Sequence, residues 1–155
     1  MSSVATLEVG ALAPEFSLPA SMGETISLAD LRGRRVVLYF YPKDDTPGCT
    51  TEACSFRDNL AAVQTTGAVL LGVSPDSVVS HQKFARKHGL EFPLLADTDK
   101  AVAARYGTLG PIGFPRRSVF IVDREGTVRY AHRAIAGLTF RPVKELLAEL
   151  AKITD

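Results

Sequence analysis

The stretch from Pro42 to Cys49 carries a thiol just after a turn, at the point where a helical pattern begins. The apolar run from Val36 to Tyr41 precedes it and predicts a buried strand. A cysteine at the start of a helix faces unpaired backbone N–H groups and the positive end of the helix dipole. Such surroundings lower the pKa of a thiol and make the sulfur a nucleophile at neutral pH. We therefore expect Cys49 to react as a thiolate.

The only other cysteine is Cys54, five positions further along the same predicted helix. Because both cysteines lie beside one loop, a role in a chemical reaction is favoured over a structural disulfide. Two alternatives stay open, because a lone buried cysteine can be a small core residue and a cysteine inside a helix can be an inert core thiol.

Composition limits the other functions that the chain could have. A length of 155 residues predicts one domain spanning residues 1–155. The formal net charge of +1 gives no electrostatic reason to expect binding to nucleic acid or to a membrane surface. The N-terminus lacks the features of a signal peptide, and no apolar run approaches the ~20 residues that cross a bilayer. We expect a cytoplasmic protein, in which a disulfide is more often transient and catalytic than structural.

Strand and helix patterns alternate along the chain and end in a hairpin and a closing helix. This order predicts an α/β fold, with a mixed central sheet flanked by helices on both faces. Strands are expected at 36–41, 68–74, 92–95, 118–122 and 127–131, and the main helices at 49–64, up to His88, at 99–106 and at 141–153.

The spacing Pro42-x-x-x-Thr46-x-x-Cys49 resembles the PxxxTxxC signature of the peroxiredoxins. The wider run from Tyr39 to Cys54, with its two cysteines, resembles the Q-type subgroup, also called bacterioferritin comigratory protein. The similarity extends to the segments 14–16 and 117–123 and to the closing helix.

This resemblance implies a thioredoxin-like fold and a thiol peroxidase that acts on hydrogen peroxide and organic hydroperoxides. It makes Cys49 the peroxidatic cysteine, gives Thr46 and Arg117 the roles of positioning the peroxide and activating the thiolate, and gives Glu52 the role of holding the arginine. The reductant would be thioredoxin or a glutaredoxin-like dithiol. We expect no cofactor and no metal. We also expect a monomer, because the expected disulfide partner lies in the same chain.

Peroxide reduction requires an anionic sulfur and hydrogen-bond donors for the O–O unit as charge moves onto the leaving oxygen. Arg117 would supply a fixed charge with several donors, whereas Pro42 would shield the sulfur and the backbone around Gly48 would add N–H groups. Arg116 competes with Arg117, because neighbouring side chains on a strand point to opposite faces. Thr46 could also be an ordinary turn residue, and Glu52 a residue favoured by the helix dipole.

Cys54 raises a geometric question. Five residues along an α-helix give a rise of about 7.5 Å and a rotation of about 140°. A disulfide needs α-carbons within about 7 Å of each other. Cys49 and Cys54 therefore cannot bond inside one intact helix, and we predict that its first turns unwind after oxidation, so that Cys54 can resolve a sulfenic acid on Cys49.

Other polar residues suggest no second site. The histidines His81, His88 and His132 are scattered without an evident set of metal ligands. The acidic residues Asp44, Asp45, Asp97 and Asp99 are interpreted as loop and capping residues. Two other functions remain open: a thiol–disulfide oxidoreductase, which the missing Cys-x-x-Cys motif disfavours, and a redox sensor or chaperone that uses the same disulfide.

Overall fold

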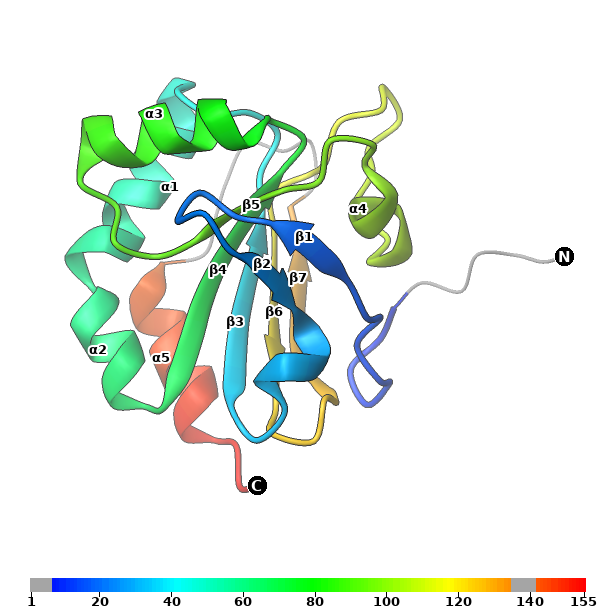
Figure 1. Ribbon diagram of the computed structural model, residues 1–155. Coiled ribbons are helices and arrows are strands. Elements are labelled where there is room, and N and C mark those ends of the chain that lie inside the picture. Colours follow the sequence, from blue (N-terminus) through cyan, green and yellow to red (C-terminus); the bar gives the residue numbers. More distant parts are fainter. Residues whose placement is uncertain (1–6, 135–141) are drawn as a thin grey trace, which may run out of the picture.

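The computed structural model of the protein describes residues 7–134 and 142–155 (Figure 1). Its centre is a five-stranded sheet in the order β5-β4-β3-β6-β7. The strands β3, β4 and β5 run parallel, and β6 and β7 pair antiparallel. The five strands are β3 (Arg35–Phe40), β4 (Ala68–Ser74), β5 (Leu94–Ala96), β6 (Ser118–Val122) and β7 (Val128–Arg133).

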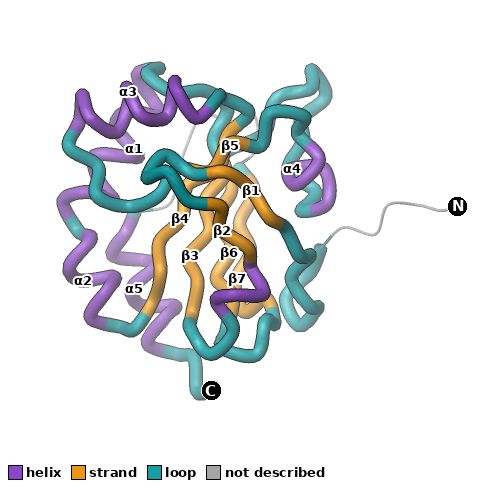
Figure 2. Tube along the Cα trace, viewed as in Figure 1, coloured by secondary structure: helices purple, strands orange, loops and turns teal. Residues whose placement is uncertain are grey.

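Helices cover both faces of this sheet (Figures 1 and 2). One face packs against α1 (Pro47–Asp58), α2 (Leu60–Thr65), α3 (Val78–His88) and α5 (Val143–Ala151). The other face is covered by α4 (Ala101–Arg105), the 3₁₀ helix η1 (Leu28–Leu31) and the chain around the small β1–β2 hairpin (Ser17–Pro19 and Thr25–Ser27). This arrangement confirms the predicted thioredoxin-like α/β fold.

The central strand β3 explains why its sequence is continuously apolar. Val37 and Tyr39 point into the core on the α1 side, whereas Val36, Leu38 and Phe40 point into the core on the α4 side. Since side chains alternate along a strand and both faces are covered, the five positions from Val36 to Phe40 are all buried, and only Arg35 at the start of the strand is polar and partly exposed.

The helix that contains Cys49 is shorter than predicted. A single helix was expected over 49–64, but α1 ends at Asp58 and α2 begins at Leu60. The Asn59 side chain donates to the carbonyl oxygen of Ser55 at 2.8 Å, and the Asn59 backbone N–H donates instead to Phe56. The side chain thus takes the place of the backbone donor, as asparagine often does, and the helix breaks.

The remaining elements follow the predicted pattern with shifted ends. Asp97 caps the N-terminus of α4 as expected, because its two carboxylate oxygens accept from the N–H groups of Val102 and Ala103. Within residues 7–134 and 142–155, no helix has the length and apolar character needed to cross a membrane.

Candidate active site

The loop between β3 and α1 places Cys49 at the N-terminal end of a helix. Thr46 occupies the N-cap position with extended backbone, and Pro47 begins the helix, where its missing N–H costs nothing. Cys49 follows in the first turn and is 1% exposed. Its sulfur therefore lies in a dry environment beside the free N–H groups of the helix start.

Arg117 is the arginine that contacts this sulfur. Its Nη1 donates to Cys49 Sγ at 3.0 Å. Sheet register explains the contact: Ser118 at the start of β6 pairs with Phe40 at the end of β3, so Arg117 lies beside the loop that leaves β3. Arg116 instead lines an apolar groove, so Arg117 and not Arg116 lies against the sulfur.

Glu52 lies one turn beyond Cys49 on α1 and is also buried. Its Oε1 is 3.7 Å from Nη1 of Arg117, which is an ion-pair distance but too long for a hydrogen bond. Burial raises the pKa of Glu52 to about 8, although the nearby Arg117 charge acts in the opposite direction. Burial outweighs the guanidinium here, so the buried carboxyl binds its proton more tightly than an exposed glutamate does.

Gly48 has a role that the sequence did not reveal. The guanidinium of Arg117 packs against its α-carbon: a Cβ built at position 48 would lie 3.0 Å from Arg117 Cζ and nearer still to Nη2. Any side chain at this position would therefore force the guanidinium to shift from the place where it contacts Cys49.

Thr46 and Pro42 border the site from the same loop. The Thr46 hydroxyl donates to the carbonyl oxygen of Lys43 at 3.0 Å and makes no capping bond to α1. Pro42 lies directly after the buried Tyr41 and forms one wall of the apolar groove that Arg116 also lines. Both residues thus lie in the loop beside Cys49, and the hydroxyl of Thr46 has a defined orientation.

Cys54 lies on the same continuous helix as Cys49, and both cysteines are free thiols. Cys54 is partly exposed, whereas Cys49 is buried. The helix geometry that keeps their α-carbons too far apart for a disulfide is therefore present in this state.

The structure corrects the interpretation of Asp44 as a simple loop or capping residue. Its side chain is only 4% exposed and accepts hydrogen bonds from Tyr41 and Ser80. It also contacts His81, which is fully buried. No local pattern marks this cluster, because its members come from the loop after β3 and from α3, and only the fold brings them together.

Fold and site together define a thiol-dependent peroxidase built on a thioredoxin-like fold. The chain belongs to the AhpC/TSA family, which it matches over residues 9–131.

Individual relatives narrow the family to its Q-type branch. Peroxiredoxin Bcp of Bacillus subtilis is 46% identical over 129 residues, covering 78% of this chain and 82% of that protein. The crystal structure of peroxidoxin BcpB from Mycobacterium tuberculosis superposes with a TM-score of 0.84 at 33% identity, covering 96% of this chain and 99% of that one. A structure of bacterioferritin comigratory protein from Xanthomonas campestris superposes with a TM-score of 0.82 at 35% identity. The superposition covers 94% of this chain and 96% of that one. The predicted resemblance to Q-type peroxiredoxins is confirmed, and with it thiol-dependent peroxide reduction.

Proposed function

We propose that Cys49 is the residue that attacks the peroxide. The observation that carries this proposal is the 3.0 Å contact between Arg117 Nη1 and Cys49 Sγ at the start of α1. A guanidinium donor and helix N–H groups stabilise a sulfur anion far better than a neutral thiol. Burial excludes water that would otherwise weaken both effects.

The first step transfers one oxygen from the peroxide to the sulfur. The Cys49 thiolate attacks one peroxide oxygen, the O–O bond breaks, and the second oxygen leaves as hydroxide or alkoxide, which takes up a proton. Cys49 is oxidised to a sulfenic acid and the peroxide is reduced to water or an alcohol. Arg117 is placed to donate to the O–O unit as negative charge moves to the leaving oxygen.

Cys54 then resolves the sulfenic acid. Its thiol sulfur bonds to Cys49 Sγ, and the hydroxyl of the sulfenic acid departs as water. Because the two residues share one helix, the first turns of α1 must open. Two features lower the cost of this opening: Thr46 makes no capping bond, a loss of about 1 kcal/mol, and Gly48 disfavours helix by about 1 kcal/mol relative to alanine.

An external dithiol completes the cycle by exchange with the Cys49–Cys54 disulfide. Thioredoxin, or a glutaredoxin-like protein, is the reductant that we propose. Since both cysteines belong to one chain, the cycle needs no second subunit and a monomer can carry it out.

Organic hydroperoxides are proposed as substrates beside hydrogen peroxide. An apolar groove of about 380 Å³ adjoins the catalytic loop at Pro42 and suits an alkyl group. The similar bacterioferritin comigratory protein of Xanthomonas campestris is described as having alkyl peroxide reduction activity. The groove is lined by Pro42, Gly110, Pro111, Ile112, Phe114, Pro115 and Arg116.

Mass spectrometry after one equivalent of hydrogen peroxide tests this cycle. We expect the intact protein to lose two hydrogens, and the loss should map to a disulfide between Cys49 and Cys54. In a Cys54→Ser protein, a sulfenic-acid trap should label Cys49. The proposal would be refuted if the mass of the parent protein stayed unchanged and the trap labelled neither the parent nor the Cys54→Ser protein.

A further inference from the structure

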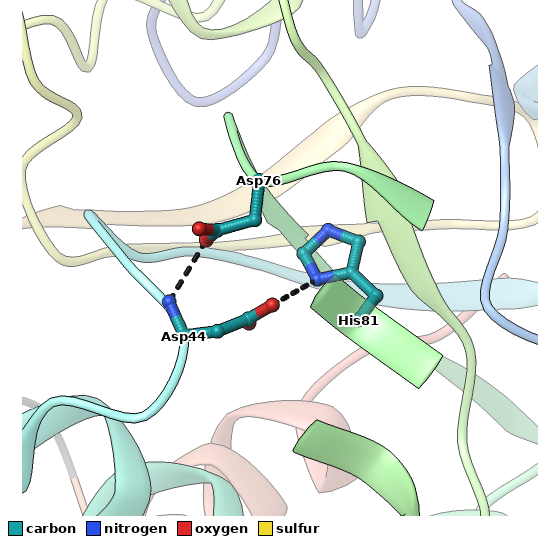
Figure 3. Close-up of side chains that lie close together, drawn as sticks. All are labelled: Asp44, Asp76 and His81. Carbon is teal, nitrogen blue, oxygen red and sulfur yellow. Dashed lines mark hydrogen bonds and ion pairs between the residues drawn. The ribbon is translucent and has the colours of Figure 1, made fainter. Parts of the chain in front are cut away.

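The Asp44 carboxylate is held by donors from two directions. Tyr41 Oη donates to Oδ1 at 2.6 Å, and Ser80 Oγ donates to Oδ2 at 2.9 Å. His81 Nδ1 lies 2.7 Å from the same Oδ2 (Figure 3). Burial raises the pKa of Tyr41 well above its ordinary value, with Tyr39 and Asp44 adding to the effect, so its hydroxyl remains a donor. The end of β3 and the first turn of α3 thus meet on one carboxylate.

His81 extends this contact to the sheet. Its Nε2 lies 2.9 Å from the carbonyl oxygen of Leu95 in β5. A carbonyl oxygen only accepts hydrogen bonds, so Nε2 carries a hydrogen. Nδ1 faces the Asp44 carboxyl group, and the 2.7 Å contact is a hydrogen bond between the imidazole and Oδ2. The imidazole therefore links Asp44 to β5 through its two ring nitrogens.

The peptide unit between Lys43 and Asp44 connects this cluster to the active site. Its N–H donates to Asp76 Oδ2 at 2.8 Å (Figure 3), and Asp76 Oδ2 also accepts from Ser74 Oγ at 2.5 Å. Its carbonyl oxygen accepts the hydroxyl hydrogen of Thr46 at 3.0 Å. With that hydrogen engaged, the lone pairs of Thr46 Oγ1 remain free to accept a hydrogen bond from a peroxide O–H.

We propose that Asp44 and His81, together with Asp76, are positioning residues for peroxide reduction at Cys49. They fix the Lys43–Asp44 peptide, which in turn orients the Thr46 hydroxyl toward the substrate. This inference rests on the proposed function, because it presupposes that Cys49 reacts with peroxide.

The same three side chains could be mistaken for a metal site, because one ligand atom from each lies within 4.8 Å of the others. Hydrogen bonding argues otherwise. The 2.7 Å contact between Asp44 and His81 has a proton between its two atoms, and Asp76 Oδ2 is already engaged by an N–H and a hydroxyl. A cation would have to displace these protons, so the cluster acts as a hydrogen-bond network.

The test compares Asp44→Asn with Asp45→Asn, both in a Cys54→Ser background that leaves Cys49 as the single thiol. Asp45 is a matched control: it lies on the same loop, but its side chain is 53% exposed and pairs with Lys87 at the surface. Two rates are measured for each protein, oxidation of Cys49 by hydrogen peroxide and alkylation of Cys49 by iodoacetamide. Alkylation needs the thiolate but has no peroxide O–H for Thr46 to accept.

Asp44→Asn should slow peroxide oxidation by about tenfold or more while alkylation changes less than about twofold, since misplacing a substrate contact costs rate but not thiolate. Asp45→Asn should leave both rates unchanged. Loss of both rates together, or of neither, would overturn the positioning role. A parent protein that lacks fast peroxide oxidation would instead refute the proposed function itself.

Asp44→Asn is used only if it folds, which far-ultraviolet circular dichroism checks against the parent protein. If it does not fold, Tyr41→Phe takes its place in the test. It removes a single hydroxyl from the network and keeps the ring that packs on Tyr39. We expect Tyr41→Phe to slow the oxidation of Cys49 by peroxide, by less than Asp44→Asn does, and to leave the rate of alkylation nearly unchanged. An unchanged ratio of the two rates in this folded variant would also overturn the inference.

Discussion

Arg117 lies against the α-carbon of Gly48 so closely that a Cβ there would be 3.0 Å from its Cζ. The same guanidinium donates to Cys49 Sγ from the other end of its planar group. The guanidinium of Arg117 therefore packs directly against the Gly48 backbone. Because Gly48 has no side chain, the guanidinium can take up the position in which it contacts the sulfur.

Gly48→Ala should separate activity from stability. Alanine favours helix over glycine by about 1 kcal/mol, so the free energy of unfolding should hold or rise. The displaced guanidinium should cost about 10²-fold or more in the rate of Cys49 oxidation by hydrogen peroxide. Stopped-flow kinetics and urea denaturation measure the two quantities; a variant with an unimpaired peroxide rate would show that the contact is dispensable.

Arg117→Lys should lose most peroxidase activity even though the charge is kept. An ammonium is a single point of donation and cannot contact the sulfur and the leaving oxygen at once, so we expect a loss of about 10²-fold. Arg57→Lys is the matched control, because Arg57 lies on α1 but is exposed and bonds to Asp58. Equal peroxide rates for the two variants would remove the special role of Arg117.

Glu52 should make the protein less stable as the pH rises. Its ordinary pKa is 4.5 and burial raises it to about 8, so between these values the folded carboxyl holds a proton that the unfolded one has lost. The free energy of unfolding should therefore fall by a few kcal/mol from pH 4.5 to pH 8 and then level off. Glu52→Gln should flatten this slope in urea denaturation curves; a slope that survives the substitution would have to come from other groups.

Cys54→Ser should stop the cycle after its first step. Cys49 should still form the sulfenic acid at the parent rate, because the donor on its sulfur is Arg117 and not Cys54. No intramolecular disulfide should follow, and turnover with thioredoxin should fall about tenfold or more, since the exchange step needs a disulfide. Parent-level turnover with thioredoxin would assign resolution to another thiol.

The sequence predicted the parts of the site that local pattern controls. Cys49 at a helix start follows from the strand, turn and helix signals on either side of it. Arg117 was preferred over Arg116 only on the family resemblance, because its contact with the sulfur depends on the register of β6 against β3. Gly48 was expected only to supply a backbone N–H, because the arginine that packs against it comes from 69 positions further along the chain. The pairing of Asp44 with His81 was missed for the same reason: it depends on how α3 sits against the end of β3.

The most direct test of the account compares the two cysteines with the same oxidant. Hydrogen peroxide is mixed in stopped flow with the Cys54→Ser protein, which keeps Cys49, and with the Cys49→Ser protein, which keeps Cys54. We expect Cys49 to react about 10³-fold faster or more, because its sulfur has the Arg117 donor and the helix N-terminus. Similar rates for the two proteins would contradict the claim that this arrangement creates the reactive thiolate.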